Sequence, residues 1–367
     1  MHILSISNTP HDPSQGSGYG ITGYLSGLKE RGHLVDAYGP ADWSWKNVRR
    51  GKRYVNPLMI AYWGLKQYIT GTYDLVELWG GDTWLLAVLL RRIDRDLPIV
   101  HHSNGIEQHR IQVQKNIPID FDNVRWFQVD LSPLYDLGLH AADAIVTLNE
   151  YDIPFLKSRG YVDSRHLHAI DTPLPESYLD RSVDWKRSNR IGYCGSWIPR
   201  KGTDIFKEDM TRFLKKHPDW TFSVVGAEQE RVLPEFPESV QPQIEVTSFI
   251  ERKKLAEWYE SLAIFAIPSF YDSFGLVMSE AMACGAALIA SNVGFASSLT
   301  HREDALILPD CSSPHLYETL SHLAEDEDMR QEIATNGYER VQSLRWDNAV
   351  GRLESIYQGL IFETPEA

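Results

Sequence analysis

Short apolar runs alternate with amphipathic segments along most of the chain. Runs such as His2–Ser7, Arg190–Cys194 and Ile264–Ile267 are brief and largely apolar, which is typical of strands buried on both faces of a parallel sheet. Leu276–Cys284 contains good helix formers and is followed by Gly285, a residue favoured just after a helix. A strand, a helix and a strand in close succession favour a βαβ unit. The pattern therefore predicts an α/β protein with parallel sheets.

The same pattern divides the chain into two halves. Further strands are predicted at His33–Tyr38, Leu75–Glu77, Pro98–His102, Ala141–Leu148, Trp220–Gly226, Ile244–Ile250 and Ala287–Ala290. Further helices are predicted from about Ile21 to Arg31 and over Leu58–Ile69, Thr83–Arg92, Arg252–Ser261 and Trp346–Phe362. Asp171–Trp185 is rich in proline and charge and has little periodicity, as linkers do. We expect an N-terminal domain over 1–170, a linker over 171–188, a C-terminal domain over 189–345 and a final helix within 346–367.

Composition narrows the class of protein. The 367 residues are 43% hydrophobic and 23% charged, which fits two globular domains with real cores. A net charge of −14 argues against a nucleic-acid binder. The three cysteines are widely spaced, without the spacing of a zinc site, and predict free thiols in a reducing compartment. The chain enters a strand at once rather than a secretion signal, and no apolar run approaches the ~20 residues of a membrane span. We expect a cytoplasmic protein.

The stretch IFAIPSFYDSFGLVMSEAMACGAALIAS, residues 264–291, has the most informative polar residues. Glu280 lies among small apolar residues on a predicted helix, where a carboxylate is costly unless a donor such as a ligand hydroxyl meets it. Asp272 precedes the helix. Between them, the amides of Phe274, Gly275 and Leu276 form a helix N-terminus, where an anion such as phosphate is favoured. An N-cap role for Asp272 and a paired core role for Glu280 are the structural alternative.

This stretch resembles the donor-site signature of retaining GT-B glycosyltransferases of family four, the glycosyl transferases group 1, which has an acid, seven other residues and then Glu. The resemblance implies the GT-B fold, two Rossmann-like domains with parallel sheets facing across a cleft. It gives Glu280 the ribose hydroxyls of a nucleotide sugar and Asp272 the hydroxyls of the transferred sugar. The amides of Phe274, Gly275 and Leu276 would face that sugar and the diphosphate. This chain has Asp where Glu is usual.

A second turn is similar to the same family. After Arg190–Cys194 the chain reads G-S-W-I-P-R-K-G, against the family's G-R-L-x-x-x-K-G, whose Arg and Lys hold the diphosphate. Lys201 matches, Ser196 replaces the Arg, and Arg200 is a candidate for the missing charge, since a guanidinium suits phosphate. Exposure as an ordinary surface residue is the alternative for Lys201.

Three further donor contacts are implied by the resemblance. Gly226 matches a glycine on the phosphate side. Phe249 and the backbone of Ile250 lie at the turn that forms the family's nucleobase pocket. A plain core role for Phe249 is an equal alternative, because aromatic residues are often buried for packing alone.

The glycines near the N-terminus allow several interpretations. Gly18, Gly20 and Gly23 spell GxGxxG, but about nine residues separate the first strand from Gly18, whereas in a dinucleotide-binding fingerprint the glycine follows the strand at once. The resemblance instead makes Gly16, Ser17 and Gly18 a loop opposite the donor phosphates, beside the acceptor. A turn without a ligand is the third interpretation.

The end of the strand Pro98–His102 should face a ligand, because ligands in open α/β sheets gather at the carboxyl ends of strands. The turn resembles the family's HG.E turn, in which a His approaches the sugar. Asn104 occupies that position here, which keeps a polar group and removes a titrating one. His102 is a candidate to compensate, with a structural role as the alternative.

Two clusters of charge need separate explanations. Trp43, Trp45, Lys46, Arg49, Arg50, Lys52 and Arg53 form a basic, aromatic patch. This patch predicts contact with an anionic membrane or an acidic acceptor, or else a solvated loop with packed tryptophans. Asp94 and Asp96, like Asp120 and Asp122, form a DxD, which holds a metal in another glycosyltransferase architecture. We interpret Asp94–Asp96 as a solvated turn and expect no required metal.

The resemblance implies retaining, metal-independent transfer of a hexosyl group from a UDP- or GDP-type sugar. The acceptor would be a hydroxyl of a saccharide or of a lipid-linked compound in surface polysaccharide or glycolipid synthesis. No further cofactor is expected, and the enzyme would be cytoplasmic or peripheral at the inner face of the membrane. Three alternatives stay open at this point. They are a sugar-nucleotide epimerase on the same fold, a non-catalytic protein that keeps the donor pocket, and a dehydrogenase.

Overall fold

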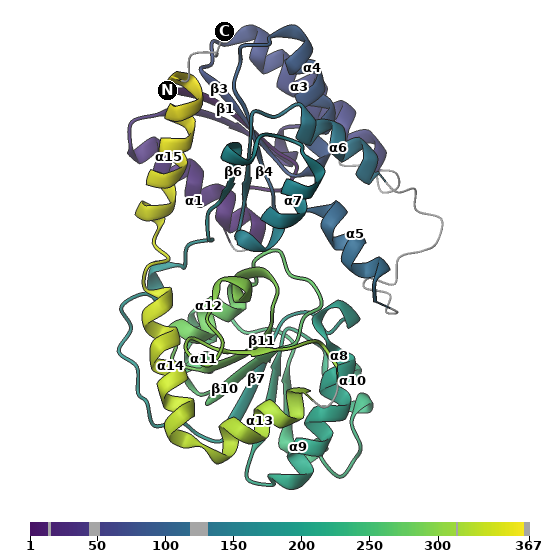
Figure 1. Ribbon diagram of the computed structural model, residues 1–367, viewed down its shortest axis with the longest axis vertical. Coiled ribbons are helices and arrows are strands. Elements are labelled where there is room, and N and C mark those ends of the chain that lie inside the picture. The colour runs from purple at the N-terminus through teal and green to yellow at the C-terminus, as the bar shows by residue number, and fades with distance from the viewer. Residues whose placement is uncertain (14–15, 44–51, 118–130, 313–314, 363–367) are drawn as a thin grey trace. The chain divides into compact units, whose positions relative to one another are not determined.

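The computed structural model describes residues 1–13, 16–43, 52–117, 131–312 and 315–362. The chain divides into two compact units. Unit 1 comprises residues 1–110, 127–173 and 346–367, and unit 2 comprises residues 111–126 and 174–345. Each unit contains a six-stranded sheet, and the strand pairs in both sheets are parallel (Figure 1). The predicted α/β class with parallel sheets is confirmed.

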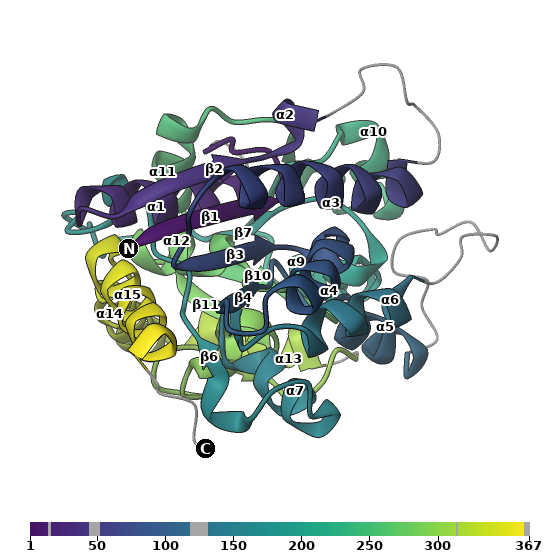
Figure 2. The same ribbon diagram turned by 90° about the horizontal axis from the view of Figure 1, so that it is seen from above.

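The sheet of unit 1 has the order β2-β1-β3-β4-β5-β6, and Figure 2 labels β2, β1, β3, β4 and β6. Its strands are β1 (His2–Ser7), β2 (Leu34–Tyr38), β3 (Leu75–Trp79), β4 (Ile99–His102), β5 (Ala144–Thr147) and β6 (Leu167–Ala169). Its helices are α1 (Gly16–Glu30), α2 (Pro40–Trp43), α3 (Lys52–Thr70), α4 (Trp84–Ile93), α6 (Ser132–His140), α7 (Ile153–Arg159) and α15 (Trp346–Phe362). Helix α5 (Glu107–Lys115) begins in unit 1 and continues across its boundary.

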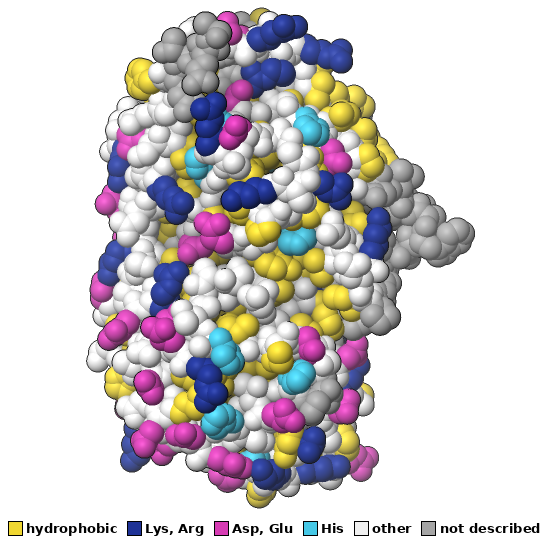
Figure 3. Space-filling view, viewed as in Figure 1, with side chains coloured by type: hydrophobic (Ala, Val, Ile, Leu, Met, Phe, Trp, Pro, Cys, Tyr) yellow, Lys and Arg dark blue, Asp and Glu magenta, His cyan; other side chains and the backbone are white. Residues whose placement is uncertain are grey.

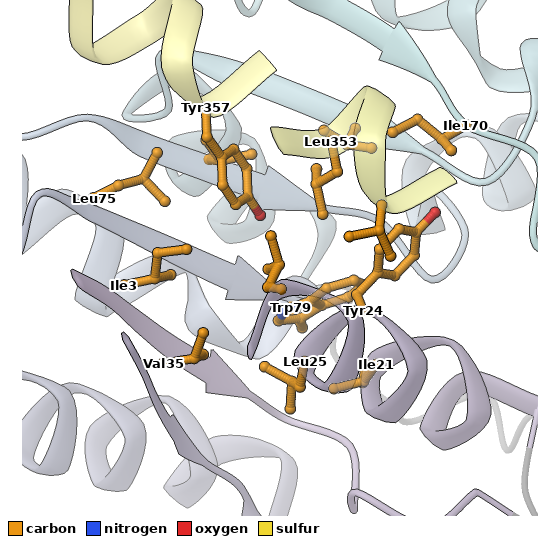
Figure 4. Close-up of a cluster of buried hydrophobic side chains, with 14 of the residues drawn as sticks. Ile3, Ile21, Tyr24, Leu25, Val35, Leu75, Trp79, Ile170, Leu353 and Tyr357 are labelled. Atoms are coloured by element: carbon orange, nitrogen blue, oxygen red, sulfur yellow. The ribbon is translucent and has the colours of Figure 1, made fainter. Parts of the chain in front are cut away.

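Both faces of this sheet are covered, as its continuous apolar strands require. Ile3 of β1 packs with residues of α1 and α15, among them Leu353 and Tyr357, whereas its neighbours Leu4 and Ile6 pack against α3 and α4. Figure 4 shows Leu353 and Tyr357 of α15 pointing toward the sheet, beside Tyr24 of α1. The last helix of the chain therefore completes the core of unit 1.

The N-terminal glycines lie in a helix rather than in a loop. Helix α1 starts at Gly16, so the prediction of a start near Ile21 is wrong, and Gly16, Ser17 and Gly18 form its first turn. A Cβ on Gly18 would lie 2.3 Å from the backbone oxygen of Asp12, and one on Gly23 would lie 2.0 Å from the Trp346 ring. Close packing therefore accounts for two of the three glycines in the GxGxxG pattern.

The sheet of unit 2 has the order β12-β11-β10-β7-β8-β9. Its strands are β7 (Arg190–Cys194), β8 (Thr221–Val225), β9 (Ile244–Thr247), β10 (Ile264–Ile267), β11 (Ala287–Ser291) and β12 (Leu306–Leu308). Its helices are α8 (Thr203–Ile205), α9 (Thr211–Lys216), α10 (Gln229–Val232), α11 (Arg252–Glu260), α12 (Leu276–Ala283), α13 (His315–Glu325) and α14 (Glu327–Val341). A π-helical segment, Phe206–Met210, joins α8 to α9.

Each sheet has one place where the strand order reverses. It lies between β1 and β3 in unit 1 and between β7 and β10 in unit 2. The loops that leave the two strands at such a point diverge, and the crevice between them is where open α/β sheets bind ligands. The topology therefore marks one binding position in each unit.

The surface has charges of both signs, which are interspersed on the face drawn in Figure 3. None of the described helices is long and apolar enough to cross a membrane. Of the proposed basic, aromatic patch, Trp43 is only 5% exposed and packs in the core with α3 and α4, so its predicted membrane contact is wrong. Trp45, Arg49 and Arg50 lie outside the described residues, as do the side chains of Lys52 and Arg53.

Candidate functional site

At the reversal point of unit 2, two segments distant in sequence are joined. The turn Pro199–Lys201 follows β7, and the loop that ends at Gly275 follows β10. Phe270 N donates to the backbone oxygen of Arg200 at 2.9 Å, and the Arg200 guanidinium donates to Tyr271 O at 2.9 Å. The side chain of Arg200 thus braces the two segments against each other.

Gly202 makes this approach possible. Its φ is +75°, and a Cβ there would lie 2.0 Å from the carbonyl oxygen of Pro268. A residue with a side chain would therefore meet both backbone strain and a clash. The K-G pair of the sequence motif has a structural reason, because Lys201 can reach the loop only when Gly202 lets the backbones meet.

Lys201 and Asp272 form an ion pair across this crevice. Their side chains are 14% and 10% exposed, so the pair is largely shielded from water and is screened little by salt. Asp272 and Arg200 also act electrostatically on the nearby Tyr193 hydroxyl, whose pKa is raised mainly by burial. The alternative interpretation of Lys201 as an ordinary exposed surface residue is therefore wrong, because its side chain is largely buried in the ion pair.

Helix α12 begins beside this pair. Gly275 has a φ of +83° and its carbonyl accepts from Met278 N at 2.8 Å, so the helix starts directly after it. The first N–H groups of a helix have no partner within it and favour an anion. The backbone around Phe274, Gly275 and Leu276 is thus a donor surface beside a cation.

Glu280 lies one turn further along α12. It is 7% exposed, and the Tyr259 hydroxyl donates to its carboxylate at 3.1 Å. Glu280 and Lys201 both act on the Cys194 thiol, whose pKa burial raises to about 12. Cys194 is the last residue of β7, so the carboxylate and the lysine both act electrostatically on the end of that strand.

The remaining predicted donor residues differ in their placement. Ser196 is exposed, and its carbonyl accepts from the Tyr193 hydroxyl at 2.7 Å. Gly226 has a φ of +93° and packs against Gly195, the first residue after β7. Phe249 is 77% exposed, so its alternative role as a core residue is wrong, and Ile250 is half-buried.

His102 does not face a ligand position. It is 2% exposed, stacks on Trp79 with ring centroids 3.9 Å apart, and is hydrogen-bonded to the Tyr357 hydroxyl at 2.7 Å. Tyr357 in turn donates to the buried Glu77. Burial, and then neighbouring His101, hold the pKa of His102 well below its ordinary value. The candidacy of His102 as a catalytic residue is wrong, because its side chain points into the α1–α15 side of the core.

The adjacent histidine, which sequence analysis missed, is on the opposite face of β4. His101 and Asn104 line a cavity of about 480 Å³ within unit 1. Strand alternation was the signal that could have found it, since neighbouring residues of a strand point to opposite faces. Asn104 therefore lies at a cavity, as its position after the strand predicts.

The aspartates of the first DxD hold a turn together. Asp94 Oδ1 accepts from the amides of Asp96 and Leu97 at 3.0 and 3.2 Å, and Asp94 Oδ2 accepts from the Tyr68 hydroxyl. Asp120 and Asp122 lie outside the described residues. Across the described ranges, no group of three His, Cys, Asp or Glu side chains is placed to hold a metal.

Comparison with known proteins shows which family the chain resembles. Residues 188–326 match the family model described as Glycosyl transferases group 1. This match covers less than half of the chain, so it shows that the C-terminal part of the chain is similar to that family. The matched range contains the Lys201–Asp272 pair, α12 and Glu280, and the family resemblance of the sequence is confirmed.

The relatives are distant but named consistently. D-inositol 3-phosphate glycosyltransferase of Jonesia denitrificans is 26% identical over 179 residues, which cover 46% of this chain and 42% of that protein. The protein of the same name from Corynebacterium glutamicum is 25% identical and covers 98% of this chain and 96% of its own length. The lipopolysaccharide core biosynthesis mannosyltransferase LpsB of Rhizobium meliloti is 24% identical and covers 53% of this chain and 60% of its own. The match thus spans less than two thirds of the first and third of these relatives.

Solved structures agree on the fold. Sucrose-phosphate synthase from Thermosynechococcus elongatus has a TM-score of 0.80 at 18% identity, and the two chains are covered to 99% and 100%. Alr3699/HepE of Anabaena, solved with UDP and glucose, has a TM-score of 0.69 at 14% identity, with 98% and 100% coverage. The chain therefore has the GT-B fold, and the epimerase alternative finds no support in these comparisons.

Proposed function

We propose that the protein transfers a hexosyl group, with retention of anomeric configuration, from a UDP- or GDP-type sugar to a hydroxyl of a saccharide or lipid-linked acceptor. The observation that carries the proposal is the site at the reversal point of unit 2. There a shielded Lys201, the N-terminus of α12 and the buried carboxylate of Glu280 lie around the ends of two adjacent strands. The cation and the amides suit a diphosphate, and the carboxylate suits the hydroxyls of the ribose joined to it.

In this proposal the departing diphosphate is the group that the site stabilises. The bond from the anomeric carbon to the phosphate oxygen breaks, and a bond to the acceptor oxygen forms on the same face. The acceptor proton passes to the leaving phosphate oxygen. Lys201 and the amides around Gly275 are aimed at the charge that develops there, which is the most effective place for fixed positive groups. Because these groups can neutralise the diphosphate, we propose that no metal is required.

The two carboxylates have different roles in the proposal. Glu280, held by Tyr259, accepts hydrogen bonds from the ribose hydroxyls. Asp272 accepts from a hydroxyl of the transferred sugar. Asp272 is paired with Lys201 here, so a bound diphosphate would compete with Asp272 for the lysine and free the carboxylate for the sugar.

Thermal shift against UDP-, GDP- and ADP-sugars and nicotinamide cofactors, with a chelator present, tests the donor. A nucleotide sugar at ~100 times its dissociation constant should stabilise the protein by about 2.7 kcal/mol. Glu280→Gln should abolish the shift, whereas the exposed Glu339→Gln should preserve it. Stabilisation without transfer to any acceptor would favour a non-catalytic binding protein. A response to nicotinamide cofactors alone would contradict the proposal.

We also propose that unit 1 contacts the inner face of an anionic membrane. Such a contact would suit an enzyme of glycolipid or surface polysaccharide synthesis. Leu58, Tyr62 and Ile69 of α3 are 62%, 64% and 72% exposed, and their spacing puts them on one face of the helix. Flotation with anionic vesicles tests this contact. The double variant Leu58→Ser, Tyr62→Ser should float less, and Leu34→Ser, which changes an equally exposed leucine on β2, should float like wild type. Equal flotation of all three would remove the contact.

A further inference from the structure

The cavity of unit 1 occupies the reversal point of its own sheet. It is bounded by the ends of β1, β3 and β4 and by the helices α3, α5 and α6. Its volume of about 480 Å³ is in the range of small-molecule sites. A transfer reaction needs a place for a second substrate, and the donor groups described above all belong to unit 2. Of the residues that line the cavity, the family resemblance assigns only Asn104 to the transferred sugar, so most of the cavity is left for a second substrate.

Two side chains of its lining have buried nitrogens without a protein partner. His101 is 6% exposed and its Nδ1 has no hydrogen-bond partner among the described residues, and the same holds for Nδ2 of Asn104. Buried polar atoms of this kind are uncommon, because each costs free energy until a partner satisfies it. A ligand with hydroxyl groups can both donate and accept, and so can satisfy either nitrogen.

A carboxylate in the lining is already oriented. Asp82 accepts from the Tyr135 hydroxyl at 3.1 Å and from Asn56 Nδ2 at 3.3 Å. Both donors are neutral, and no ion pair to Asp82 is found in the described part of the chain. An ionised carboxylate only accepts hydrogen bonds, so a further partner of Asp82 must be a donor such as a ligand hydroxyl.

The described part of the lining contains no lysine or arginine that could pair with an anion. Glu107 also lines it, with its carboxylate paired to Arg110 at 2.7 Å. Burial lowers the pKa of His101 to about 4, so its ring is neutral at pH 7. A phosphate here would be repelled by the carboxylate of Asp82, and no cation of the described lining would offset that repulsion.

We infer that this cavity binds the acceptor, and that the acceptor part it holds is an uncharged polyhydroxy compound, a sugar or cyclitol without a phosphate or carboxylate. The inference rests on the proposed function, since it supplies the second substrate of that transfer. The inferred acceptor also differs from the one in the names of two relatives, because D-inositol 3-phosphate bears a phosphate.

Saturation-transfer NMR on the full chain tests the charge preference with matched pairs. The pairs are myo-inositol with myo-inositol 1-phosphate, methyl α-glucoside with glucose 6-phosphate, and methyl α-mannoside with mannose 6-phosphate. In at least one pair the neutral compound should bind about tenfold more tightly. The inference would be overturned if the phosphorylated compound bound as tightly as the neutral one, or more tightly, in every pair that responds. It would also be overturned if no neutral compound bound.

Substitution of Asp82 tests whether these compounds bind in the cavity of unit 1. Asp82→Asn keeps the shape of the side chain and removes its charge, so it should weaken the neutral compound about fivefold and bring the two members of a pair closer in affinity. Asp96→Asn, an exposed aspartate of the same unit, should change neither affinity. If Asp82→Asn leaves both affinities unchanged, the cavity is not the site; if it does not fold, the wild-type pairs still decide the charge preference.

Nucleotide binding separates the two proposals. If a neutral compound binds at Asp82 while no nucleotide sugar stabilises the chain, the cavity stands and the transferase proposal falls. If a nucleotide sugar binds but only phosphorylated acceptors respond, the transferase proposal stands and the preference for an uncharged acceptor falls.

Discussion

The two reversal points of this protein have the same topology and opposite chemistry. In unit 2, Lys201 and Arg200 lie in a crevice with a helix N-terminus, so the fixed groups favour an anion. In unit 1, the cavity has the carboxylate of Asp82 and two unpartnered nitrogens, and its described lining has no lysine or arginine. The topology of a parallel sheet marks where a ligand is expected to bind, and we propose that a few loop residues decide whether that ligand carries a phosphate.

The largest expected effect comes from removing the cation of unit 2. Lys201→Met should lower the transfer rate about 100- to 1,000-fold, because one fixed group is lost from the developing charge on the diphosphate. Steady-state kinetics with the donor found by thermal shift measure this. Lys215→Met, which changes an exposed lysine of the same unit, is the control. A rate within threefold of wild type for Lys201→Met would end the assignment of Lys201 to the diphosphate.

The next effect concerns the backbone that brings the lysine to the loop. Gly202→Ala should destabilise unit 2 by about 3 kcal/mol, because strain at positive φ is added to a clash with Pro268. Gly160 has a similar φ of +64° with open space around it, so Gly160→Ala should cost only about 1 kcal/mol. Urea unfolding measures both. Equal losses would mean that the close approach of the two turns does not constrain the residue.

A fall in pH should lower the free energy of unfolding of unit 1, because His101 becomes protonated. Its pKa in the folded protein is about 4, below the ordinary 6.5, so between these values the unfolded chain binds the proton more readily than the folded one. The resulting stability is complete above pH 6.5 and is lost as the pH falls toward 4, by up to about 3 kcal/mol. His101→Gln should flatten the fall relative to wild type in urea titrations at several pH values, and the exposed His322→Gln should leave it unchanged. The same slope in all three proteins would contradict a neutral His101.

The smallest effect is the loss of the group that orients Glu280. Tyr259→Phe removes the hydroxyl that donates to the carboxylate at 3.1 Å, which should weaken donor binding by about 1 kcal/mol, or fivefold. Calorimetric titration of the nucleotide sugar measures the change, with Tyr62→Phe as the control at an exposed tyrosine. An unchanged affinity would show that Glu280 needs no support from α11.

Local pattern was sufficient for most elements and for the fold class. The apolar runs and their following helices predicted β10, α12 and α15 closely, because burial on both faces leaves a continuous signature in the sequence. The start of α1 was missed, since three glycines among Gly16–Gly20 have low helix propensity. Contacts with Asp12 and Trp346 explain two of the glycines of α1, Gly18 and Gly23, and both partners lie outside the helix.

The sequence by itself determined the α/β class, the resemblance to a family and the candidate residues for a diphosphate and a ribose, because these depend on periodicity and on short motifs. Only the tertiary structure decided which of two adjacent histidines lies at a cavity, that Arg200 braces a loop, and that Lys201 is paired with Asp272. Those outcomes depend on packing between segments that are distant along the chain. His102 is turned inward because α15, more than 200 residues later, supplies the hydroxyl of Tyr357 that it contacts.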